Sequence, residues 1–148
     1  MGANRLAAQA TNHCLTGCGI GEVLGLVLAT WWGWGNAASI ALAVALAFLF
    51  GYLLTLIPLL RAGTALAAAI GIALVADTLS IATMELVDNA ILLLWPGAMD
   101  AYLDDALFWI SLAIALAVAW GPTFLVNRAL IRRGKGHAHV HAAHGHAH

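Results

Sequence analysis

Four long apolar runs, at residues 14–32, 37–60, 64–94 and 105–131, dominate the pattern of hydrophobic and polar positions along the chain. Each run is close to or above the roughly 20 residues that an α-helix needs to cross about 30 Å of hydrocarbon. The first run contains Glu22 and two cysteines, which argues against a cleaved signal peptide. The pattern predicts an all-α polytopic membrane protein, with residues 1–136 forming one domain of four transmembrane helices in an up-down bundle.

The third run contains a polar stripe inside its apolar surroundings. At 100° per residue, one face of this helix collects Asp77, Ser80, Ile81, Met84, Glu85 and Asp88. A carboxylate in hydrocarbon costs roughly 2.5 to 3.5 kcal/mol even on the mild insertion scale, so such residues usually face the bundle interior and mark a site or pathway. The alternative is that the carboxyls are neutral and only hydrogen-bond neighbouring helices.

Two rows of residues follow the first helix side by side. One row, at i, i+4 and i+8, contains Cys14, Cys18 and Glu22; the adjacent row contains Gly17, Gly21 and Gly25. A row of small residues lets another helix backbone approach closely. We therefore expect a neighbouring helix to pack directly beside the Cys and Glu row.

The basic residues are informative by position. In a four-span topology all of them fall on one side, namely Arg5, Arg61, Arg128, Arg132, Arg133 and Lys135, whereas most tryptophans fall near the other side. The positive-inside rule then places both termini in the cytoplasm, as in a multi-pass protein of the bacterial inner (cytoplasmic) membrane whose principal partner is the lipid bilayer. No basic patch interleaved with aromatic residues is present, so we expect no nucleic-acid partner.

The C-terminal segment 137–148 is rich in histidine. Six of its twelve residues are histidine, beginning with His137, His139 and His141. Short His-rich tracts bind transition metals through neutral imidazole. We expect a flexible cytoplasmic tail that gathers metal near the mouth of the bundle.

The candidate ligands fall into a soft set and a hard set. His13, Cys14 and Cys18, with Met84 across the helix gap, offer imidazole, thiolate and thioether ligands that favour a copper ion or, alternatively, a zinc ion. A second set offers hard oxygen ligands or proton carriers, and we predict that it lines an ion pathway: Glu22, Asp77, Ser80, Glu85 and Asp88. Alternatively, the cysteines are only small buried residues at a helix contact.

A family resemblance rests on five motifs: H-C-L-T-G-C-G-I-G-E (13–22), D-T-L-S-I-A-T-M-E-L-V-D-N (77–89), P-G-A-M-D (96–100), L-F-W (107–109) and N-R-A-L-I-R-R-G-K-G-H-A (127–138). With these motifs the chain resembles a family of small bacterial and archaeal integral membrane proteins known only as a domain of unknown function. The resemblance associates the chain loosely with copper handling. The tail beyond His141 is richer in histidine than the usual family ending.

These features predict a protein that binds and transports or otherwise handles a transition-metal ion, without catalytic residues, since Ser80 has no histidine partner nearby. One alternative is a homo-oligomeric proton or cation channel, or a membrane assembly subunit, built around the Asp77 face. Another is a quinone-linked thiol oxidoreductase using Cys14 and Cys18, although such enzymes generally pass electrons between two cysteine pairs and this chain has one.

Overall fold

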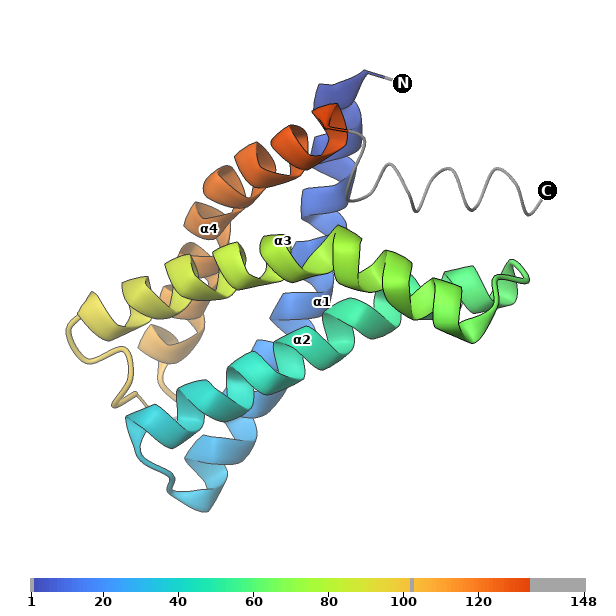
Figure 1. Cartoon of the computed structure of the whole chain (residues 1–148). Helices are drawn as coiled ribbons and strands as arrows, with labels where there is room; N and C mark the ends of the chain where they lie inside the picture. The colour runs from blue at the N-terminus through green and yellow to red at the C-terminus, as the bar shows by residue number, and fades with distance from the viewer. Residues whose placement is uncertain (1, 102, 134–148) are drawn as a thin grey trace.

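The computed structural model describes residues 2–101 and 103–133, which form four helices (Figure 1). Their bounds are α1 (Ala3–Trp32), α2 (Asn36–Arg61), α3 (Leu66–Leu94) and α4 (Ala106–Arg132). All four are long and apolar enough to cross a membrane. The predicted tail ligands His137, His139 and His141 lie outside the described residues.

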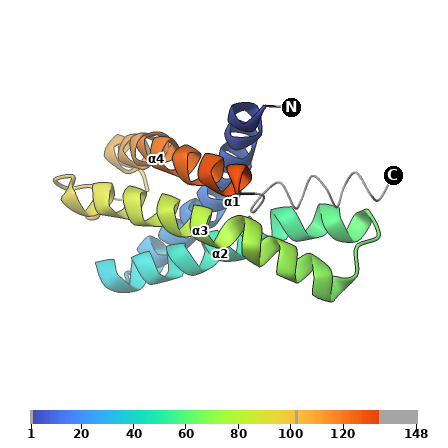
Figure 2. The same ribbon diagram turned by 45° about the horizontal axis from the view of Figure 1, so that its top comes forward.

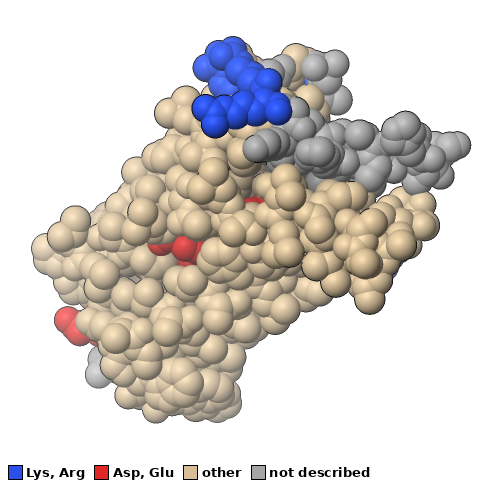
Figure 3. All heavy atoms as spheres, in the orientation of Figure 1, with Lys and Arg blue, Asp and Glu red and all other residues tan. Residues whose placement is uncertain are grey.

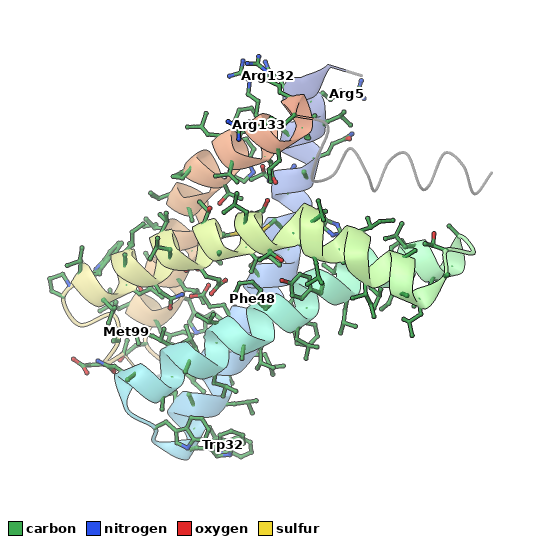
Figure 4. The ribbon with its side chains drawn as sticks, in the orientation of Figure 1. Arg5, Trp32, Phe48, Met99, Arg132 and Arg133 are labelled. Atoms are coloured by element: carbon green, nitrogen blue, oxygen red, sulfur yellow. The ribbon has the colours of Figure 1, made fainter. Side chains whose placement is uncertain are left out.

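The two ends of the helix bundle differ in chemistry. Where α1 begins and α4 ends, Arg5, Arg132 and Arg133 gather; we call this the arginine end (Figures 3 and 4). At the opposite end, the tryptophan end, lie Trp32 and the segments that join α1 to α2 and α3 to α4. The α2–α3 loop does not join the arginine end, because it lies away from the ends of α1 and α4 in both ribbon views (Figures 1 and 2).

The glycine row of α1 packs against the backbone of α2, as the small-residue spacing predicts. A Cβ placed on Gly25 would lie 2.6 Å from the Cα of Ala43, and one on Gly17 would lie 2.8 Å from the Cα of Gly51. A Cβ on Gly21 would overlap the backbone at Ala47. The partners on α2 recur every four residues in descending order, so α1 and α2 are an antiparallel pair in close backbone contact.

Helix α3 crosses α1 near the middle of the molecule (Figures 1 and 2). Its polar stripe is buried along its whole length, from Asp77 through Ser80, Ile81, Met84 and Glu85 to Asp88. Around the crossing, Cys14, Cys18, Ile81 and Met84 belong to one hydrophobic cluster, which Ala47 of α2 and Ala119 of α4 complete. The crossing therefore brings the Cys and Glu row of α1 against the stripe of α3.

Helix ends differ from the predicted runs mainly at the N-terminus. The first apolar run was expected to begin at about Cys14 after a polar lead, but α1 begins at Ala3. Alanine has the highest helix propensity, and the lead contains Ala7, Ala8 and Ala10, so the backbone stays helical beyond the apolar run. At the other end of α1, Gly33 (φ 72°) closes the helix in the left-handed conformation.

Candidate functional site: a buried carboxylate cluster

Three carboxyl groups from two helices converge inside the bundle. Glu22 of α1 and Glu85 and Asp88 of α3 each place a carboxylate oxygen within 4.8 Å of the others. All three are buried, with Glu22 and Asp88 0% exposed and Glu85 3% exposed. We call this set the carboxylate cluster. Its members occupy the inward faces that the spacing of both helices predicts.

An asparagine one turn beyond Glu85 holds part of the cluster in place. The Nδ2 of Asn89 donates to Oε2 of Glu85 at 3.2 Å and to Oδ1 of Asp88 at 3.0 Å. It also donates to the backbone oxygen of Glu85 at 2.8 Å. Sequence reasoning missed Asn89 as a site residue, although its i+4 spacing from Glu85 places it on the same side of α3.

The remaining four oxygens of the cluster receive no hydrogen bond from an N–H or hydroxyl group of the described residues, but the Cys18 thiol lies beside Glu85 and the Glu22 and Asp88 carboxyls lie beside each other. Both carboxylate oxygens of Glu22, Oε1 of Glu85 and Oδ2 of Asp88 are buried without a hydrogen-bond partner in residues 2–101 and 103–133. Three negative charges this close together in an apolar bundle are strongly unfavourable. The cluster therefore requires a cation or protons to balance it.

The two cysteines lie on the arginine-end side of the cluster. Their Sγ atoms are 3.6 Å apart, and both cysteines are free and buried. Cys18 also lies beside Glu85, and Met84 shares its hydrophobic cluster. The predicted soft ligands Cys14, Cys18 and Met84 thus lie next to the hard ligands, with Cys18 at the junction.

His13 and Asp77 form a separate polar group nearer the arginine end. The Nε2 of His13 lies 2.9 Å from Oγ1 of Thr55 on α2. The Thr55 hydroxyl also hydrogen-bonds with Asp77 of α3. Asp77 precedes Glu85 by eight residues, or about 12 Å along the helix. Of the predicted ion-pathway residues, Glu22, Glu85 and Asp88 thus form the carboxylate cluster, whereas Asp77 belongs to this His13–Thr55–Asp77 group.

Ser80 belongs to a third polar group, which joins three helices. Its hydroxyl donates to Oδ1 of Asn127 on α4. The Nδ2 of Asn127 in turn donates to Oγ1 of Thr11 on α1 at 3.0 Å. All three side chains are buried, and hydrogen bonds of this kind hold membrane helices together. The role of Ser80 in an ion pathway stays a prediction; in the structure its hydroxyl donates to this network.

Comparison with known proteins identifies a family but no characterised relative. The family model described as "Domain of unknown function (DUF4396)" matches residues 4–136. This match agrees with the family resemblance inferred from the sequence motifs. No curated protein and no solved structure matches the chain significantly.

Proposed function

The chain belongs to the DUF4396 family, and we propose that it is an integral membrane protein that binds a transition-metal cation in the carboxylate cluster and moves it across the bilayer. The observation that carries this proposal is the convergence of Glu22, Glu85 and Asp88, whose buried oxygens lie within reach of one ion and have unused lone pairs. Oxygen ligands of a tetrahedral zinc site at ~2.0–2.2 Å lie about 3.3–3.6 Å apart. The three carboxylate oxygens, which lie within 4.8 Å of one another, would therefore move closer together to hold one ion.

The neighbouring sulfur ligands narrow the choice of ion. Zinc accepts both carboxylate and thiolate ligands, and copper binds oxygen as Cu(II) and sulfur as Cu(I). Cys18 lies beside Glu85, so an ion leaving the carboxylates toward the arginine end meets a thiol first. Zinc and copper each suit both sets of ligands.

The positive-inside rule indicates which side of the membrane each group of ligands faces. With the arginine end in the cytoplasm, Cys14 and Cys18 lie on the cytoplasmic side of the carboxylate cluster. His13, Thr55 and Asp77 lie on the same side and already hydrogen-bond one another. We assign the His13–Thr55–Asp77 group to holding α1, α2 and α3 together, and the carboxylate cluster to the ion.

The test is the metal stoichiometry of the purified chain after exposure to zinc or copper and removal of free ions. We expect about one ion per chain, retained after truncation following Gly136, because the carboxylates lie outside the His-rich tail. Glu22→Gln and Asp88→Asn should each abolish this ion. Asp104→Asn, which changes an exposed carboxylate between α3 and α4, is the matched control and should retain it.

A second function is favoured by the same unpartnered oxygens, because protons can balance the cluster as well as a metal can. In that case the chain conducts protons or another monovalent cation, as a channel would. Flux through vesicles containing the purified chain separates the two. Proton flux that persists without metal, and stops in Glu22→Gln, would replace the metal proposal with the channel function.

A further inference from the structure

A cavity at the tryptophan end lies about one helix turn beyond the carboxylate cluster. It has a volume of about 320 Å³ and lies between the connections α1–α2 and α3–α4. Its polar lining includes Asn36, Ser39, Asp100 and Ser111, and its apolar lining includes Leu26 and Leu92. The hydroxyls of Ser39 and Ser111 donate to backbone carbonyls, which leaves their oxygen lone pairs able to accept.

Two of the lining residues separate this cavity from the carboxylate cluster. Leu26 follows Glu22 by four residues on α1, and Leu92 follows Asp88 by four residues on α3, so each leucine lies one turn, or about 6 Å, farther toward the tryptophan end. Both are buried, at 5% and 3% exposure, and both belong to one hydrophobic cluster with Phe108 and Leu112. The cavity and the cluster are thus separated by a single apolar layer.

The charge at this end suits a cation. The connecting segments 33–35 and 95–105 contain Asp100, Asp104 and Asp105 but no Lys or Arg. Figure 3 shows a group of basic side chains at the opposite end of the molecule. Fixed charges of one sign around an opening raise the local concentration of oppositely charged ions. Asp100, which lines the cavity itself, supplies the nearest carboxylate.

A groove of about 410 Å³ between α2 and α3 also reaches the cluster, because Glu85 and Asn89 line it. Its other lining residues are apolar, including Val44, Phe48 and Leu86, so in a bilayer its outer side would face hydrocarbon. Entry of an ion from hydrocarbon carries the full desolvation cost. The cavity at the tryptophan end is therefore the better route for a hydrated ion.

We infer that a divalent cation passes between the carboxylate cluster and the non-cytoplasmic side through the cavity at the tryptophan end. This inference rests on the proposed function. Leu26 and Leu92 form the closed barrier between the two. Hydrophobic constrictions of this kind block ions by excluding water, and they open by small movements of the helices that carry them.

Cys18 provides a built-in reporter for this barrier. It lies one turn on the arginine-end side of Glu22 and is fully buried, so a thiol reagent added at the tryptophan end must pass the leucines to reach it. The experiment uses the full-length chain with Cys14→Ser, in vesicles that expose the tryptophan end, and a small, positively charged, membrane-impermeant methanethiosulfonate. The rate of Cys18 modification is measured with and without free zinc.

We expect slow modification in the parent chain and at least tenfold faster modification after Leu92→Ala or Leu26→Ala. Leu92→Val, a smaller truncation, should give an intermediate rate and guards against misfolding. Leu59→Ala, at a fully buried leucine near the end of α2, removes the same volume elsewhere and should leave the rate unchanged. Equal rates in the Leu92, Leu26 and Leu59 variants would overturn the inferred route.

Comparing the rates of Cys18 modification with and without zinc tests the proposed function separately. Zinc bound at the carboxylate cluster lies between the leucines and Cys18 and should slow modification of the Leu92→Ala variant at least threefold. Faster modification that zinc does not slow would support the entrance but contradict the metal site. Modification that neither Leu26→Ala nor Leu92→Ala accelerates, in a chain that binds zinc, would contradict the entrance alone.

Discussion

Replacing Gly25 with alanine should destabilise the protein, whereas the same change at Gly71 should not. A methyl group on Gly25 would lie 2.6 Å from the Cα of Ala43, well inside the ~3.5–4.0 Å of a favourable carbon contact. The α1 and α2 backbones must then move apart, and overpacking of this kind costs about 1–3 kcal/mol. The gain of about 0.5–1 kcal/mol from removing a glycine within a helix offsets part of this cost.

The expected net loss is on the order of 1–2 kcal/mol, which corresponds to a fall in Tm of roughly 2–8 °C for a chain of this size. At Gly71 of α3, the added methyl group would meet no described atom within 4 Å beyond its chain neighbours and the backbone of its own helix. Gly71→Ala should therefore keep the Tm or raise it by up to about 4 °C. The two substitutions are chemically identical and differ only in what the methyl group meets.

The assay follows thermal unfolding in detergent with a maleimide dye that fluoresces on reaction with thiols. Cys14 and Cys18 are buried and free, so the dye reports the loss of the folded state. Neither substitution changes a cysteine. A Gly25→Ala chain that melts at or above the parent temperature would refute the close α1–α2 contact.

Two further predictions concern buried amides. Asn89→Leu should weaken zinc or copper binding by about 10- to 100-fold, as expected when a residue that orients metal ligands is lost. Thr83→Val, at a half-buried position whose hydroxyl donates to the backbone of its own helix, should leave binding unchanged. Equal titrations for both variants would contradict the role of Asn89. Asn127→Leu removes the hydrogen-bond partner of Ser80 and Thr11 and should lower the free energy of unfolding by about 1–3 kcal/mol in the dye assay. Asn4→Leu, at an exposed position, should cause no measurable change. An unchanged Tm for Asn127→Leu would mean that this network does not join the helices.

The helices and their inward faces were predictable from single-helix periodicity. Spacing alone placed Gly17, Gly21 and Gly25 in a packing row, and the structure confirms a close helix partner there. The same reasoning identified the buried stripe of α3. These features depend only on the geometry of one helix and on apolar burial.

The register between helices was not predictable in this way. Nothing in the period of α1 or α3 indicates that Glu22 meets Glu85 and Asp88, or that Asp77 meets Thr55 instead. That register depends on how closely the small residues of α1 and α2 let the two helices approach, and on where α3 then crosses α1. The cavity at the tryptophan end was also missed, because two connections distant in the sequence form it together.

The central claim is that buried carboxylates hold a transition-metal ion, and X-ray absorption at the zinc edge tests it most directly. The purified chain, truncated after Gly136 and loaded with one equivalent of zinc, should show a first shell dominated by oxygen at about 2.0–2.2 Å. A single sulfur at about 2.3 Å is compatible with Cys18 as a further ligand. A shell of sulfur or imidazole nitrogen without carboxylate oxygen, or a shell unchanged by Glu22→Gln with Asp88→Asn, would contradict the claim.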